Sequence, residues 1–382
     1  MSNKPKKNQP QPARLLVYLT LVIALYALPA SSQQVHQLLY DNAKWADLNL
    51  GGAFTDTSSG LSAFTTGTAL HTYYLASDDH VHQLYNVGGG WGDQDLTQLA
   101  GGPVAISRSA VTGFALQNFQ YVYYVSNNQH IHQLLYNNSL WGDSDLTAQT
   151  GGALSSTSTQ LAAFATTPNN ALHVYYMAST GHIHQLYNTG SSWADEDLTA
   201  ETGGPSGNGV WMAGVNIANF QYVYFVANTG HVHEFFYNNS VWTDQDLTTL
   251  TGIAKVAPGS GVAALVVPGT KKLRVYLINK KNHVLQLASK NNQGWKSNDL
   301  TKLSFGPTAD AFNGLTGFAT TPNNQLHVYY VSGNHVNQLF FNGQNWANED
   351  LTLLTNGPLA EGTGGMAGFS VANFQYVYYL AQ

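Results

Sequence analysis

The 382-residue sequence contains no cysteine and has few charged residues. Disulfide bonds and thiolate metal sites are therefore excluded, and stability must come from packing and strand pairing. Only 9% of the residues are charged, 12% are aromatic, and glycine (37) far outnumbers proline (12). Beyond the N-terminal segment, no stretch of ten or more residues shows helical periodicity. These features favour many short, aromatic-rich strands joined by Gly and Asn turns.

Positive charge is especially scarce after the N-terminus. The formal charge of −6 includes four basic residues within the first 14 positions. Without them 11 bases face 21 acids, which gives a net charge of about −10. This balance argues against nucleic acid and against anionic membranes as partners.

The N-terminal segment has the order of a secretory signal. A basic stretch at 4–14 precedes an apolar run at 15–28 and the small residues of 29–32. The run is shorter than the roughly 20 residues of a spanning helix, so we predict a signal peptide over 1–32 and a secreted domain over 33–382. An uncleaved membrane anchor is the alternative.

One motif returns along the whole remaining chain. Seven of the eight tryptophans recur about every 50 residues, at positions 45, 91, 141, 193, 242, 295 and 346. Asp-Leu-Thr begins four positions after each of them, except that Asn49-Leu50-Gly51 follows the first. Each repeat shows four short apolar runs, for example 111–116, 121–125, 131–136 and 141–146. This pattern predicts an all-β fold, a seven-bladed β-propeller of four-stranded antiparallel blades.

The two ends of the repeat region complement one another. The region begins with the last two runs of a repeat, at 35–49, and stops after the first two runs of another, at 366–380. We therefore predict that one blade is shared between N- and C-terminal strands and closes the ring. Two different motifs precede the second run of a repeat. Asn-Phe-Gln-Tyr ends at 121, 222 and 376, whereas Thr-Pro-Asn-Asn-x-Leu-His ends at 173 and 327. The blades thus multiplied in pairs, and the unit that contains 268–274 fits neither type.

Histidines and aspartates recur in pairs. Four His-x-His pairs place two imidazoles on one face of a strand, a possible metal site that lacks a recurrent third ligand. Histidines bonded to their neighbours are the interpretation we favour, with no metal and no cofactor. The Asp pairs, such as Asp93 and Asp95, could bind calcium, but a solvated Asp and a turn-capping Asp explain them more simply. No unrepeated catalytic set breaks the symmetry.

At these positions the repeat resembles the secreted β-propeller lectins, namely the fungal fucose-specific lectin family and the bacterial seven-bladed propeller lectins. The family's blades read Ala-Ala-x-x-Trp, x-Arg-Val-Tyr-Tyr, Ile-x-Glu and Gly-Trp. Their counterparts here include 161–164, 173–176, 183–185 and 192–193. The resemblance implies sugar sites between blades, where an Arg and a Glu bond the hydroxyls and an aromatic ring stacks on the sugar.

The resemblance also implies which residues would bind sugar. Carried over by position, they are His71, Gln83, Tyr121, Gln133, His173, Gln185, Tyr222, Glu234, Arg274, Gln286, His327 and Gln338. In the shared blade the two positions are Tyr376 and Gln37. No blade keeps both Arg and Glu, so the resemblance implies a glycan ligand without singling out fucose. Alternatively, the paired side chains simply bond one another between blades.

We therefore predict a secreted, non-catalytic lectin that binds glycans at several weak sites and gains avidity from their number. One alternative is a propeller scaffold for protein–protein or cell-surface interaction. A secreted glycosidase is a weaker alternative, since the fold alone does not decide the activity.

Overall fold

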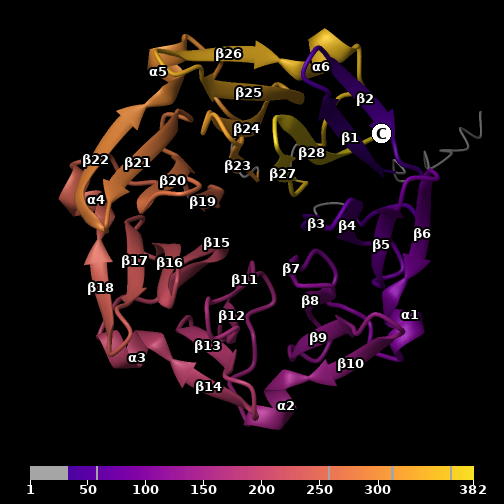
Figure 1. Cartoon of the computed structure of the whole chain (residues 1–382). Helices are drawn as coiled ribbons and strands as arrows, with labels where there is room; N and C mark the ends of the chain where they lie inside the picture. The colour runs from indigo at the N-terminus through magenta and orange to yellow at the C-terminus, as the bar shows by residue number, and fades with distance from the viewer. Residues whose placement is uncertain (1–32, 57–58, 257–258, 311–313, 362–363) are drawn as a thin grey trace, which may run out of the picture. The chain divides into compact units, whose positions relative to one another are not determined.

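Short antiparallel strands occupy most of the chain that the computed structural model describes, which is residues 33–56, 59–256, 259–310, 314–361 and 364–382. The predicted signal peptide lies outside the described residues. Among the described residues, no helix is long and apolar enough to cross a membrane. The described strands form seven four-stranded sheets arranged in a ring (Figure 1). The predicted seven-bladed propeller is confirmed.

Blades are numbered here in chain order, starting with the first complete one. Blade 1 consists of β3 (Ser62–Thr66), β4 (Ala69–Leu75), β5 (Val81–Asn86) and β6 (Trp91–Asp95). Blade 2 consists of β7 (Val111–Leu116), β8 (Phe119–Val125), β9 (Ile131–Tyr136) and β10 (Trp141–Asp145). Blade 3 consists of β11 (Ala162–Ala165), β12 (Leu172–Met177), β13 (Ile183–Asn188) and β14 (Trp193–Asp197). Blade 4 consists of β15 (Gly207–Ile217), β16 (Phe220–Ala227), β17 (Val232–Tyr237) and β18 (Trp242–Asp246).

The remaining blades follow the same order. Blade 5 consists of β19 (Val262–Val266), β20 (Lys272–Ile278), β21 (Val284–Lys290) and β22 (Gln293–Asp299). Blade 6 consists of β23 (Thr316–Ala319), β24 (Leu326–Ser332), β25 (His335–Phe341) and β26 (Trp346–Asp350). Blade 7 combines β27 (Ala367–Val371) and β28 (Phe374–Ala381) with β1 (Gln34–Tyr40) and β2 (Trp45–Asn49).

Blade 7 closes the ring as predicted. Its strand order is β2-β1-β28-β27, and β1 pairs along its whole length with β28, with Leu38 opposite Val377. The innermost strand of every blade contacts the innermost strands of both neighbours, including β27 with β3 (Figure 1). The two ends of the domain are therefore joined by a strand ladder instead of being left as open edges.

The core lies between the blades. Consecutive residues of a strand point to opposite faces, so Tyr73 and Tyr74 face the two neighbours of blade 1, and both are fully buried. Equivalent buried tyrosines recur in the second strand of the other blades, and each hydrophobic cluster combines residues of two adjacent blades. Burial of both faces explains why the sequence runs alternate so weakly.

A five-residue helix follows the outer strand of blades 1 to 6, where the sequence predicts only a capped turn. The helices are α1 (Leu96–Ala100), α2 (Leu146–Thr150), α3 (Leu198–Thr202), α4 (Leu247–Thr251), α5 (Leu300–Ser304) and α6 (Leu351–Thr355). The capping role is correct, since the Asp before each helix accepts a bond from the third helical N–H, as Asp95 does from Gln98. A left-handed residue ends each helix, for example Gly101 with φ of 70°.

Candidate functional site

Three grooves of one design lie between blades 1 and 2, blades 3 and 4, and blades 6 and 7. They are called grooves 1–2, 3–4 and 6–7, and their volumes are about 660, 550 and 420 Å³. These volumes fall in the range of ligand pockets. In each, the first blade supplies a buried His and Gln, and the second blade supplies a Gln, a Tyr and a Trp.

Buried neutral side chains form the floor of groove 1–2. Gln83 on β5 donates through Nε2 to Nδ1 of His71 at 2.9 Å and to the hydroxyl of Tyr73 at 2.8 Å. The same Nε2 lies 2.7 Å from Oε1 of Gln120, which extends from β8 of blade 2. Tyr73 donates to that oxygen as well, and Gln94 on β6 donates to Oε1 of Gln83. The network joins two blades without any charged group.

The same floor recurs in the other two grooves. The amide Nε2 of the third-strand Gln again faces the His Nδ1 of its own blade and the Gln Oε1 of the next blade. These distances are 2.6 Å for Gln185–His173 and 2.9 Å for Gln185–Gln221, and 2.6 Å for Gln338–His327 and 3.0 Å for Gln338–Gln375. In each floor the hydroxyl of the neighbouring Tyr also donates to the Gln Oε1 of the next blade, so the two amide hydrogens and this hydroxyl together satisfy the three acceptors.

The groove histidines are neutral. Burial lowers the pKa of His71, of His173 and of His327 to about 4. Their Nδ1 atoms accept from glutamine, so Nε2 carries the proton. In groove 1–2 the Nε2 atom lies 2.7 Å from the hydroxyl of Thr66. Nε2 of His327 is buried and has no partner among the described residues.

Half-buried tyrosine and phenylalanine rings line the grooves from both sides, together with a tryptophan that is buried in two of the three grooves. In groove 1–2 they are Tyr85 on β5 and Tyr136 on β9, which packs on Trp141 with ring centroids 5.4 Å apart. In the other grooves the corresponding rings are Tyr187, Tyr237 and Trp242, and Phe340, Tyr40 and Trp45. An apolar ring beside neutral donors and acceptors suits a ligand with one polar edge and one apolar face.

The outer strand adds one group that differs between the grooves. Opposite the floor Gln stands Gln94 in groove 1–2, Glu196 in groove 3–4 and Glu349 in groove 6–7. Burial and the neighbouring carboxyl of Glu201 raise the pKa of Glu196 to about 7. Burial also raises the pKa of Glu349, against the opposing indole N–H of Trp45. Two grooves thus carry an ionisable acceptor, and one carries a neutral amide.

The other four seams are built differently. Where blades 2, 4 and 7 present a Gln to the preceding blade, blades 1, 3, 5 and 6 present a leucine: Leu70, Leu172, Leu273 and Leu326.

The two positions at which the resemblance predicts sugar-binding residues lie on the second and third strands of each blade. In blades 1, 3 and 6 they hold a His and a Gln that are hydrogen-bonded to each other. In the remaining blades the two positions make separate contacts. Tyr121 stacks on Phe114, and Gln133 donates to Tyr123 at 2.9 Å.

Blades 4 and 5 contain the two charged members of the predicted set. Glu234 is fully buried and accepts a 2.6 Å bond from Asn292 of blade 5, and burial raises its pKa to about 7. Tyr222 lies in the same blade and stacks on Phe236 with centroids 4.9 Å apart. Arg274 donates to the carbonyl of Leu273 at 2.8 Å.

Burial lowers the pKa of Arg274. In the same blade, Gln286 donates to the hydroxyl of Tyr276 at 3.2 Å. The two charged side chains thus have different partners, and neither lies in one of the three grooves.

The sequence analysis missed the groove residues that the second blade contributes. Gln120, Gln221 and Gln375 are the glutamines of the three Asn-Phe-Gln-Tyr motifs, one position before the residue that the resemblance singled out. Their side chains point to the opposite face of the strand and reach the preceding blade. The motif's recurrence was the available signal.

Comparisons with known proteins agree with this architecture. Residues 208–365 match the fungal fucose-specific lectin family. The predicted resemblance is confirmed in that region, which spans blade 4 to the start of blade 7. No curated protein sequence matches the chain.

Three solved propeller lectins share the fold of this chain. A lectin of Burkholderia pseudomallei is 15% identical, covers 82% of this chain and 89% of its own, and has a TM-score of 0.62. AofleA of Arthrobotrys oligospora is 15% identical over 91% and 92%, with a TM-score of 0.55. The six-bladed fucose-binding lectin of Aleuria aurantia is 17% identical over 77% and 96%, with a TM-score of 0.53. At these identities the likeness concerns the fold.

Proposed function

We propose that this protein is a secreted, non-catalytic lectin that binds glycans in grooves 1–2, 3–4 and 6–7. The observation that carries the proposal is the recurrence of one polar floor flanked by aromatic rings at three seams, whereas the other four seams have a leucine in place of the second blade's Gln. A purely structural contact between blades has no need for half-exposed rings and an open cavity. The family match and the glycan ligands of the related lectins support the same class of ligand.

Each groove can contact a monosaccharide on two sides. A ring such as Tyr187 offers a surface for the apolar face of the sugar, and Glu196 and the floor Gln185 offer acceptors and donors for its hydroxyls. Each site is shallow and neutral at its base, so we expect millimolar to micromolar affinity per site and avidity from three sites on a rigid ring. The Arg/Glu pair of the family is missing, so fucose is one candidate among neutral sugars.

A glycan array probed with the purified protein tests the proposal. We expect binding to a defined set of glycans, lost when Tyr85→Ala, Tyr187→Ala and Phe340→Ala are combined, one ring from each groove. Leu135→Ala is the matched control, because Leu135 holds the position of Tyr85 in blade 2 and lines none of the three grooves. A blank array for a folded protein, or equal binding by both variants, would contradict the proposal. In that case the scaffold role becomes the better explanation, and turnover of chromogenic glycosides would indicate an enzyme.

A further inference from the structure

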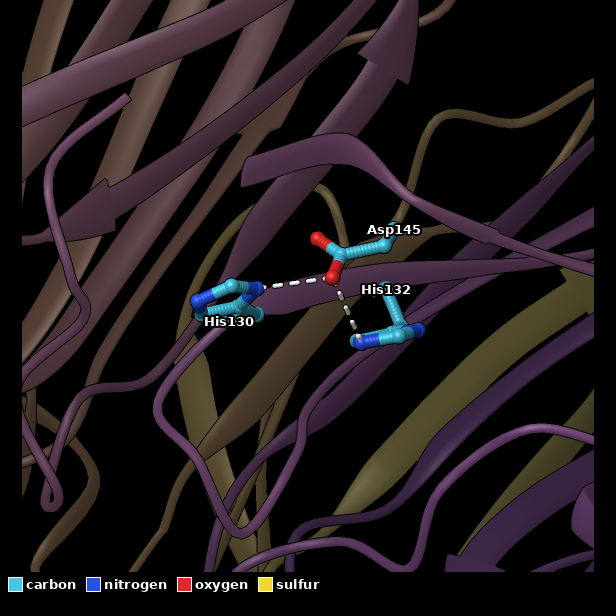
Figure 2. Close-up of side chains that lie close together, drawn as sticks. All are labelled: His130, His132 and Asp145. Carbon is cyan, nitrogen blue, oxygen red and sulfur yellow. Dashed lines mark hydrogen bonds and ion pairs between the residues drawn. The ribbon is translucent and has the colours of Figure 1, made fainter. Parts of the chain in front are cut away.

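The outer edge of blade 2 holds a group of metal-ligand side chains that the proposed glycan sites do not use. His132 lies on β9, His130 directly precedes that strand, and Asp145 ends the adjacent β10 (Figure 2). Nδ1 of His130 lies 2.7 Å and Nε2 of His132 lies 3.6 Å from the same Asp145 oxygen, Oδ2. The sequence analysis found no third ligand for a His-x-His pair. Strand pairing supplies one, because Asp145 stands opposite His132 in the ladder.

His132 makes a second contact through its other ring nitrogen. Its Nδ1 lies 2.9 Å from Oδ2 of Asp143, so the ring donates to that carboxylate. Nε2 then presents a lone pair, and this atom is buried without a hydrogen-bond partner. This lone pair lies 3.6 Å from the Asp145 carboxylate oxygen, and a cation placed between the two atoms would be attracted to both. A carboxylate that orients a histidine through Nδ1 is also the usual outer partner of a metal-bound imidazole.

The remaining geometry suits a small divalent ion. The three ligand atoms lie within 4.8 Å of one another. The edge of a zinc tetrahedron with bonds of about 2.0–2.1 Å is about 3.3 Å, between the two distances that Asp145 Oδ2 makes. Oδ1 of Asp145 caps helix α2 through the N–H of Ala148 at 2.8 Å, so Oδ2 is the oxygen that an ion would bind, in place of its hydrogen bond with His130 Nδ1. His130 and Asp145 are about a quarter exposed, so an ion can enter from solvent.

We propose that His130, His132 and Asp145 bind a divalent transition-metal ion of the zinc class. Three protein ligands leave a fourth position for water or a ligand atom. The set His231, His233 and Asp246 in blade 4 has the same spacing and is a second site of this kind. Lys255 lines the hollow beside that second site, so its ammonium opposes a cation and weakens the second site relative to the first.

Titration of the chelator-stripped protein with Zn²⁺ by calorimetry, and with Co²⁺ by visible absorption, tests the proposal. We expect saturable binding and a Co²⁺ spectrum of a site with nitrogen ligands. Asp145→Asn keeps an oxygen for the helix cap but removes the carboxylate, and we expect it to weaken the tighter site by about tenfold or more. His130→Gln, a change at a partly exposed residue, should do the same.

Blade 5 offers the matched control. Asp299 there bonds Nδ1 of His283 at 2.8 Å and caps helix α5, but Leu285 replaces the second histidine. Asp299→Asn therefore removes the same kind of carboxylate without a metal site, and we expect metal binding to stay unchanged. The proposal is wrong if Zn²⁺ shows no saturable binding. It is equally wrong if Asp145→Asn and His130→Gln bind Zn²⁺ as tightly as the Asp299→Asn control.

Discussion

His327 makes the folded protein sensitive to acid in a way that one substitution can isolate. Its side chain is 3% exposed, and burial lowers its pKa to about 4, against about 6.5 for a histidine of the unfolded chain. As the pH falls below 6.5, the unfolded state binds a proton that the folded state refuses until about pH 4. The free energy of unfolding therefore falls with pH across this window.

The size of the effect follows from the two pKa values. Full titration corresponds to about 3 kcal/mol, and about 2.5 kcal/mol is lost between pH 7.5 and pH 4.5. The variant His327→Gln keeps an acceptor for Gln338 but has no proton to gain. We expect it to be less stable than the parent at pH 7.5, because packing in the groove floor is lost. At pH 4.5 this deficit should shrink by about 2.5 kcal/mol or reverse.

Urea unfolding at pH 7.5, 5.5 and 4.5 measures this difference. Other groups titrate in both proteins, so only the difference between parent and variant reports on His327. Tyr121→Phe is the control, because in blade 2 this position holds a tyrosine instead of a histidine, and its effect should not depend on pH in this range. Parallel stability curves for the parent and His327→Gln would refute the buried, neutral histidine.

Two further changes test other parts of the structure. Glu234→Gln should stabilise the protein at pH 8. Burial raises the pKa of Glu234 to about 7, so its contribution to the free energy of unfolding is fully present below pH 4.5 and is lost as the pH rises through about 7. Thermal melts should show a smaller gain at pH 5, and an equal gain at both pH values would contradict the assignment. Asp350→Ala removes the cap of α6 and the 2.7 Å contact with His335, so denaturant unfolding should show a loss of about 1 kcal/mol or more. Asp350→Asn should lose less, and an equal loss would argue against the cap.

The ring itself was predictable from the sequence because its signals are local and repeated. Each tryptophan and its Asp-Leu-Thr lie within one hairpin and helix start, and the interrupted repeats at the two ends specify the shared blade. The helices were not predictable in the same way, since five residues are too short to show a 3.6-residue period. What the sequence did show was their capping residue, Asp95 and its equivalents.

The candidate site was only half predictable. The His71–Gln83 pair follows from two adjacent strands of one blade, so spacing alone brings it together. Gln120 completes the floor from the next blade, and its partner depends on how two blades face one another across a seam. The two motifs that mark the blade types were visible in the sequence. Which neighbouring blade the glutamine of each motif faces could be seen only in the structure. The same holds for Asp145, whose place beside His132 depends on strand register.

A crystal structure of the protein with the glycan that binds best on the array tests the central claim most directly. We expect the sugar in grooves 1–2, 3–4 and 6–7, stacked on Tyr85, Tyr187 and Phe340 and bonded to the outer-strand Gln94, Glu196 and Glu349. The four seams that have leucine in place of the second blade's Gln should stay free of sugar. Sugar bound at those leucine seams, or only in the channel at the centre of the ring, would contradict the account.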